Sequence, residues 1–176
     1  MPITVVEYNS AWPAEFGRVR GALAGALGGL PVAIEHVGST AVPGLAAKPV
    51  LDIDVVVESL DCLSLVVQRM AAIGYAHEGD LGITGRHAFA APAGPPARHV
   101  YVCAAGAIPL REHLAFRDYL RRNPGDAMVY AALKRELAAS VGDDRAAYTE
   151  GKTTFVRGIL ARCGRSLQAA ITSKAA

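Results

Sequence analysis

The densest polar chemistry of the chain lies in Glu35-His36-Val37-Gly38-Ser39-Thr40 and, after a loop, in Lys48-Pro49-Val50-Leu51-Asp52-Ile53-Asp54-Val55-Val56-Val57. Residues 32–37 and 50–57 have the β-branched composition of strands, and the glycines and prolines between them predict a loop. Asp52 and Asp54 are two residues apart, so both side chains project from one face of the second strand. The many valines around them predict that this strand is central in a sheet.

Two carboxylates on a central strand repel each other, and burial penalises both of them. A divalent cation would remove both costs, and hard oxygen ligands suit magnesium or manganese. The alternative is a strand end at which both acids are solvated or pair with arginines. Asp52 and Asp54 are therefore the candidate metal ligands.

The Gly38-Ser39 step is a candidate phosphate site. A turn after a strand exposes backbone N–H groups and a hydroxyl, which together can hold a phosphate. Glycine permits the close approach that phosphate oxygens require. We extend this cradle to Thr40 and to Lys48, which stands before the acidic strand. Lys48 has an equal alternative, which is to pair with Asp52.

The remaining patterns predict an α+β fold. Helices are expected from about Ala11 to Leu27 and up to about Ile73, followed by strands after Tyr75 and at 87–91 and 99–104. Three helices then follow, at roughly 109–122, 125–141 and 144–163. We expect a small mixed β-sheet with helices on one side over residues 1–107, and a helical C-terminal subdomain over 108–165. Residues 166–176 are expected to form a flexible tail, and the site should be a cleft between the two parts.

Composition limits the classes of protein. The 176 residues are 52% hydrophobic and 19% charged, which fits one domain with a real core. A net charge of +2 argues against a strongly basic protein that coats nucleic acid. No apolar run approaches the roughly 18 residues that span a bilayer, and the N-terminal sequence lacks signal-peptide features. We therefore expect a cytoplasmic protein without a membrane partner.

Charge is divided unevenly along the chain. Residues 1–110 hold 6 basic and 9 acidic side chains, a balance of −3, whereas residues 111–165 hold 11 and 7, a balance of +4. Arg117, Lys134 and Lys152 fall on three different predicted helices of the basic part, and together they are candidates for a cationic wall opposite the carboxylates. For any one of them, a solvated helix face is the alternative.

Two further residues complete the candidate set. Arg86 follows a glycine at a strand entry and could reach a phosphate. His99 could ligate a metal or contact a phosphate, and its alternative is a hydrogen-bonded strand residue.

The Gly-Ser step, a gap of twelve residues and an Asp-x-Asp pair on an apolar strand resemble the signature of the polymerase-beta-like nucleotidyltransferase superfamily. The wider sequence resembles the GrpB family over about residues 4–162, through Val6–Pro13, Glu35–Pro49, Leu114–Arg121, Tyr130–Lys134 and Tyr148–Lys152. The resemblance implies a nucleotidyltransferase-like fold in which the Gly-Ser step contacts nucleotide phosphates and the acidic pair holds divalent metals. A similar domain is fused behind dephospho-CoA kinase in some bacteria, which implies a nucleotide-linked context.

The chain departs from the enzyme pattern at one position. Enzymes of this type place a third acid on a later strand, but the matching strand 98–102 offers His99 and Tyr101 and no carboxylate. The leading hypothesis is a magnesium-dependent nucleotidyltransferase that transfers a nucleoside monophosphate to a small molecule or protein, with Asp52 and Asp54 as catalytic residues and Asp54 or His99 as candidate general base. The alternatives are a non-catalytic domain that binds a nucleotide or phosphometabolite, and a structural partner-binding domain. Nucleic acid is not an expected partner, since there is no basic run and no aromatic stacking motif.

Overall fold

The computed structural model describes the backbone of residues 2–174 and the side chains of residues 2–164. Within this range the elements follow one another in the order α1 (Trp12–Ala26), β1 (Val32–Val37), η1 (Ser39–Ala41), β2 (Leu51–Val57), η2 (Leu60–Cys62), α2 (Leu63–Ala71), β3 (Ala76–Gly79), β4 (Arg86–Ala90), β5 (Arg98–Ala104), α3 (Ile108–Arg122), α4 (Pro124–Val141) and α5 (Arg145–Lys174).

The strands form one mixed sheet in the order β1-β2-β5-β4-β3. β2 pairs antiparallel with β1 and parallel with β5, so the acidic strand has a neighbour on each side, as its apolar sequence predicts. β4 pairs antiparallel with β5 and β3. The register places Glu35 opposite Asp54 across β1 and β2, and Asp52 opposite His99 across β2 and β5.

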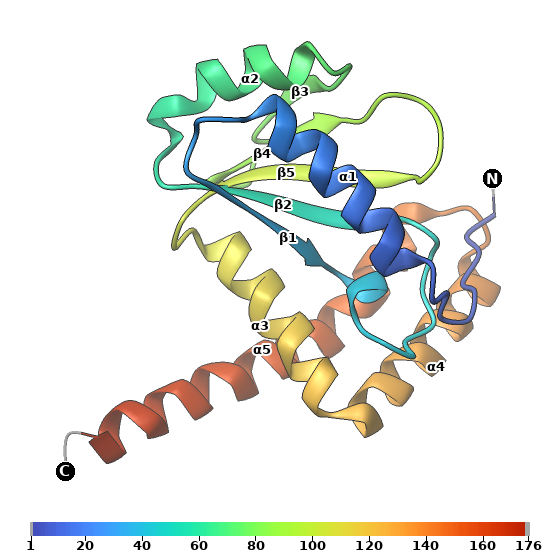
Figure 1. The fold of residues 1–176 in the computed structure, drawn as a ribbon. Coiled ribbons are helices and arrows are strands. Elements are labelled where there is room, and N and C mark those ends of the chain that lie inside the picture. The colour runs from blue at the N-terminus through green and yellow to red at the C-terminus, as the bar shows by residue number, and fades with distance from the viewer. Residues whose placement is uncertain (1, 175–176) are drawn as a thin grey trace.

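The sheet has one apolar face and one polar face. Ile53, Val55 and their neighbours on β5 are buried against α1 and α2, which cover the upper face in Figure 1. Each fully buried valine, leucine or isoleucine contributes about 1.5–3 kcal/mol to folding. Asp52 and Asp54 alternate with these residues, so they project from the opposite face, beneath which α3 and α5 lie (Figure 1).

The C-terminal helices pack on the polar side of the sheet and on the loop after β1. A second apolar cluster joins this loop to α3 and α4 through Val42, Leu45, Leu120 and Tyr130. Arg121 donates from Nε and from a terminal amino group to the Ala41 carbonyl, at 3.0 and 2.8 Å. The helices therefore hold the glycine-containing loop in place.

The expected α+β architecture is confirmed, and α3 begins at Ile108, next to the predicted division between core and helical subdomain. The tail predicted at 166–176 coincides with the last turns of α5, and residues 175 and 176 lie outside the described residues.

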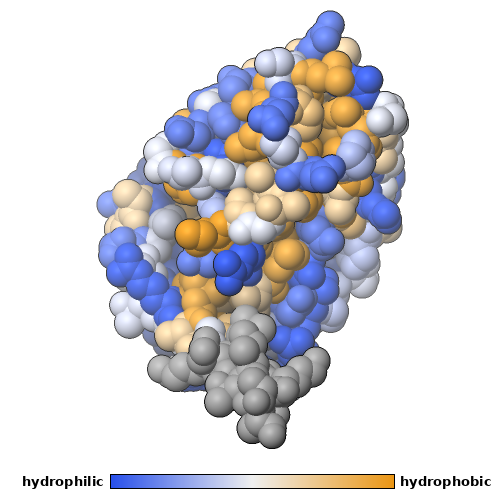
Figure 2. Space-filling view, turned by 90° about the vertical axis from the view of Figure 1, so that its left-hand side faces the viewer, coloured by the Kyte–Doolittle hydropathy of each residue, from blue (hydrophilic) through white to orange (hydrophobic). Residues whose placement is uncertain are grey.

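The surface in Figure 2 is the face that lies at the left in Figure 1, and its apolar residues gather in patches between hydrophilic ones. Among the described residues, no helix combines the length and the hydropathy that crossing a bilayer requires.

Candidate functional site

The turn after β1 is shaped around Asp52. Gly38 has φ +69° and ψ −167°, a conformation that is essentially restricted to glycine. A Cβ at this position would lie 2.2 Å from Oδ2 of Asp52 and 2.9 Å from its Cβ. The backbone of the Gly-Ser step therefore lies against the first carboxylate, and no larger residue fits.

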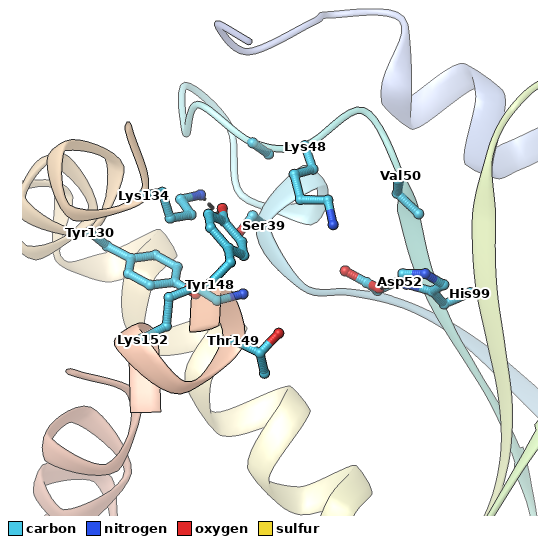
Figure 3. A pocket seen from close by; sticks show the side chains of 11 residues that line it. Ser39, Lys48, Val50, Asp52, His99, Tyr130, Lys134, Tyr148, Thr149 and Lys152 are labelled. Carbon is cyan, nitrogen blue, oxygen red and sulfur yellow. Dashed lines mark hydrogen bonds and ion pairs between the residues drawn. The ribbon is translucent and has the colours of Figure 1, made fainter. Parts of the chain in front are cut away.

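A cavity of about 220 Å³ opens beside this turn. β2 and β5 form one side, the loop after β1 forms another, and α4 and α5 close it (Figure 3). The residues that line it are Ser39, Ala47, Lys48, Val50, Asp52, His99, Tyr130, Lys134, Tyr148, Thr149 and Lys152. Six predicted site residues thus meet in one cavity, although almost a hundred residues separate Ser39 from Lys134.

Lys134 is the buried cation of this cavity. It is 2% exposed, and its Nζ donates to Ser39 Oγ at 3.0 Å and to the Ala46 carbonyl. Burial lowers the pKa of Lys134 to about 7, and the positive charges of Lys152 and Arg135 act in the same direction, against Asp52. An anion in the cavity would supply the negative charge that this ammonium lacks.

Lys48 and Lys152 both lie near the Tyr148 ring, with Nζ atoms 5.6 and 4.3 Å from its centroid. Burial and the charge of Lys48 lower the pKa of Lys152. The negative face of an aromatic ring attracts such cations. The predicted cationic wall is therefore formed by three lysines rather than by Arg117.

Each carboxylate of the acidic pair is hydrogen-bonded to a histidine. Asp52 Oδ1 lies 2.9 Å from His99 Nδ1 at the edge of the cavity, where both side chains are partly exposed. Asp54 is fully buried, and its Oδ2 lies 2.7 Å from Nδ1 of His113 on α3. Burial alone would lower the pKa of His113, but the hydrogen bond and charge of Asp54, with the charge of Asp52, raise it above its ordinary value.

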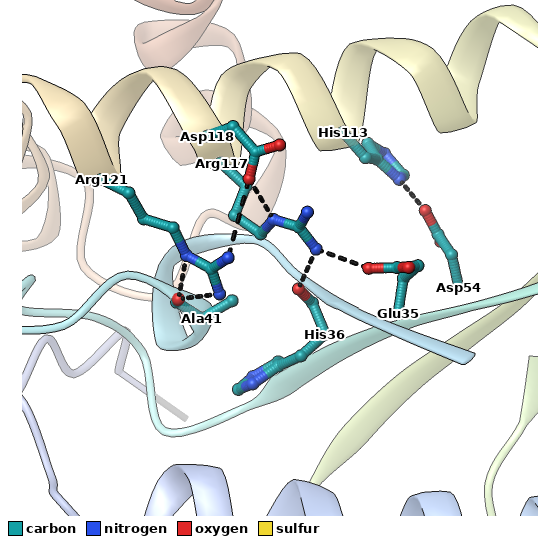
Figure 4. Close-up of polar contacts among 8 residues, drawn as sticks. All are labelled: Glu35, His36, Ala41, Asp54, His113, Arg117, Asp118 and Arg121. Atoms are coloured by element: carbon teal, nitrogen blue, oxygen red, sulfur yellow. Dashed lines mark hydrogen bonds and ion pairs between the residues drawn. The ribbon is translucent and has the colours of Figure 1, made fainter. Parts of the chain in front are cut away.

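Three predicted phosphate ligands lie away from the cavity. Thr40 is 1% exposed, and its hydroxyl is hydrogen-bonded to His36 Nε2 at 2.9 Å, so it fixes the turn. Arg117 donates to Glu35 at 2.7 Å and to the His36 carbonyl at 3.0 Å, which ties α3 to β1 (Figure 4). Arg86 lies over the Tyr101 ring, 4.1 Å from the centroid.

The donor set fits a divalent cation in one specific respect. Oδ1 of Asp54 is buried and, among the described side chains, has no hydrogen-bond partner, an arrangement that is costly without a ligand. No group of three or more histidine, cysteine or acidic side chains in the described part of the chain is arranged to hold a metal. Asp52 and Asp54 alone suit Mg²⁺, which commonly takes one or two carboxylates and completes its shell with water and substrate phosphates.

Three residues that line the cavity, Tyr130, Tyr148 and Thr149, are not among the candidates predicted from the sequence. His113 carried a usable signal, since it is four residues from Arg117 and therefore shares its helix face. That face is now seen to cover Glu35 and Asp54 (Figure 4).

The GrpB protein family model matches residues 2–162, and the chain belongs to this family. It is 36% identical to the UPF0157 protein YqkA of Bacillus subtilis over 155 residues, covering 88% of this chain and 45% of that protein. A solved structure of the conserved protein GrpB from Enterococcus faecalis is similar with a TM-score of 0.83 and 34% identity, over 94% of this chain and 99% of that one.

Two more distant matches were also found. The dephospho-CoA kinase of Mycolicibacterium paratuberculosis is 31% identical over 89% of this chain and 44% of that protein. A chain in the structure of the GLD-2/RNP-8 complex is similar with a TM-score of 0.54 and 16% identity, over 74% of this chain and 54% of that one. At that identity the likeness concerns the fold alone. The α+β fold class expected from the sequence, with a mixed sheet and C-terminal helices, is confirmed.

Proposed function

We propose that this chain binds a nucleoside triphosphate together with a divalent cation, and transfers its nucleoside monophosphate to a small molecule or protein. The observation that carries the proposal is the cavity that Lys48, Lys134 and Lys152 line together with Asp52. A polyphosphate bridging the two sides would join the cations of the C-terminal helices to a metal on the acidic strand.

Magnesium or manganese bound to Asp52 and Asp54 would neutralise charge on the phosphates and on the pyrophosphate leaving group. Asp52 reaches the cavity directly, whereas Asp54 has only its buried Oδ1 available, since Oδ2 is hydrogen-bonded to His113. Ser39 and the backbone of the Gly38 turn would contact phosphate oxygens, and Lys48 and Lys152 would hold the remaining negative charge. This arrangement orients the ligand and stabilises charge before any bond changes.

A second candidate is a domain that binds the same ligand without transferring any group. It is favoured by the two residues that lie beside Asp54 on the neighbouring strands of the sheet. On β5 this neighbour is Tyr101, which is not an acid. On β1 it is the carboxylate Glu35, but Glu35 is engaged by Arg117 at 2.7 Å. The third acid beside the pair is thus held by an arginine rather than left free to bind a metal or to accept a proton.

Transfer is tested by incubating the pure chain with each of the four labelled nucleoside triphosphates, magnesium and cell extract. The proposal predicts labelled product with at least one nucleotide, its loss in Asp52→Asn, and its retention in Glu136→Gln. Glu136 is exposed on α4, so this control removes one negative charge outside the cavity. If calorimetry detects binding while no label is transferred, the second candidate replaces the first.

A further inference from the structure

The proposed transfer needs a base that removes the proton of the acceptor, and the carboxylate beside the acidic pair, Glu35, is not among the residues that line the cavity and is paired with Arg117. Asp52 is the carboxylate among the described residues that line it. Its hydrogen-bond partner there is His99, which has no hydroxyl or thiol group. The Asp52–His99 pair therefore offers a base without a nucleophile.

The other polar pair of the cavity contains both. Ser39 Oγ lies 3.0 Å from Lys134 Nζ (Figure 3), and Lys134 is in turn oriented by the Ala46 carbonyl. A nucleophile within hydrogen-bond reach of a base, with a third group orienting the base, is the arrangement found in covalent catalysis. Among the described residues of the cavity, Ser39 is the hydroxyl for which a hydrogen bond to a basic side chain is observed.

Lys134 has the surroundings of an amine that loses its proton near neutral pH. It is 2% exposed, and the hydrogen bonds found for its Nζ are to the Ser39 hydroxyl and the Ala46 carbonyl. Lys152 on α5 and Arg135 on α4 repel its positive charge, and Asp52 on β2 opposes them; burial is the largest influence, and its pKa falls to about 7. As an ammonium, Lys134 donates to Ser39 Oγ and to the Ala46 carbonyl. Once it is neutral, the amine keeps a donor for the carbonyl and gains a lone pair that can accept the Ser39 proton.

Building on the proposed function, we propose that Ser39 is the nucleophile that receives the nucleotidyl group, with Lys134 as its general base. Ser39 Oγ forms a bond to the α-phosphorus, the bond from that phosphorus to the bridging oxygen breaks, and pyrophosphate leaves. The hydroxyl proton passes to Lys134 Nζ. A hydroxyl that contacts a phosphate oxygen lies on the order of 3–4 Å from the phosphorus, close to the separation of a reactive pair.

The test is the intact mass of the full chain after incubation with magnesium and ATP, GTP, CTP or UTP, followed by peptide mapping. One nucleoside monophosphate is expected on Ser39 with at least one nucleotide, together with one equivalent of pyrophosphate. Ser39→Ala should abolish the adduct. Ser140→Ala should not, since Ser140 is exposed on α4 and donates to the Leu137 carbonyl outside the cavity.

Lys134→Arg separates the role of a base from that of a cation. It keeps the positive charge but does not lose its proton near pH 7, so it should bind nucleotide while labelling falls at least tenfold. If circular dichroism shows that this variant does not fold, the wild-type pH profile decides. The labelling rate should rise with pH as Lys134 loses its proton, and a flat profile would overturn the role of Lys134.

The outcomes separate this inference from the proposed function. Binding by calorimetry with no adduct on Ser39 overturns the inference and leaves the proposed function standing. An adduct on another residue, or a phosphoryl group alone on Ser39, also overturns it. Failure to bind any of the four nucleotides overturns both.

Discussion

Gly38→Ala should destabilise the protein more than alanine at any other turn glycine with open surroundings. The φ of +69° and ψ of −167° place an alanine in a region that costs about 1–3 kcal/mol. The added Cβ would lie 2.2 Å from Asp52 Oδ2, so the carboxylate or the turn must shift, at about 1–3 kcal/mol more. The total is about 2–6 kcal/mol, a large part of the stability of a domain of this size.

Urea denaturation of Gly38→Ala and Gly44→Ala isolates the contact with Asp52. Gly44 also has a positive φ, +78°, but an added Cβ there meets no atom within 4 Å. Gly44→Ala should therefore be destabilised only by the backbone strain that alanine introduces, about 1–2 kcal/mol. Equal losses in the two variants would refute the close packing of the Gly-Ser turn on the first carboxylate.

Three further predictions concern the charged groups around the cavity. The pKa of Lys134 falls from 10.5 to about 7 on folding, so the unfolded chain binds more protons than the folded chain between these two pH values. The free energy of unfolding of the wild type should therefore rise over that pH range by about 2–5 kcal/mol relative to Lys134→Met, as measured by urea unfolding. Parallel pH slopes in the two proteins would show that Lys134 is not buried as described. Folding raises the pKa of His113 above 6.5, so His113 contributes to the stability of the fold below pH 6.5, and this contribution is lost as the pH rises through the folded pKa. His113→Ala should therefore lower the melting temperature more at about pH 6 than at about pH 9. Equal effects at both pH values would count against the Asp54–His113 bond. Arg117→Ala should destabilise the chain by about 1–3 kcal/mol through loss of its bonds to Glu35 and the His36 carbonyl, whereas nucleotide affinity should change less than tenfold. A larger loss of nucleotide affinity would show that Arg117 takes part in nucleotide binding.

The acidic strand and its surroundings could be predicted from local patterns. The two-residue spacing of Asp52 and Asp54 fixes their common face, and the valines around them fix a central strand, since both follow from the geometry of one strand. The order of strands, helix and loop over residues 32–57 needs no information from distant parts of the chain. Beyond this segment, helical spacing and turn residues predicted the remaining elements, and the GrpB resemblance implied a nucleotidyltransferase-like fold.

The contacts of α3 with the sheet could not be predicted in the same way. Arg117 and His113 share a helix face, but helical spacing does not tell whether that face meets the cavity or the strands beside it. In the structure this face covers Glu35 and Asp54. The prediction that Thr40 contacts a phosphate is not supported for a related reason, because only the packed turn shows that its hydroxyl faces His36 rather than the cavity. The pairing of Lys134 with Ser39 likewise depends on how α4 docks on the loop.

Calorimetric titration with magnesium and each nucleoside triphosphate tests the central claim most directly. The wild-type chain should give saturable heat with at least one nucleotide, and the heat should depend on magnesium. Asp52→Asn should weaken the affinity at least tenfold, which is about 1.4 kcal/mol, while Glu136→Gln leaves it unchanged. Absence of heat with all four nucleotides, or equal affinity in wild type and Asp52→Asn, would contradict a metal-linked nucleotide site in this cavity.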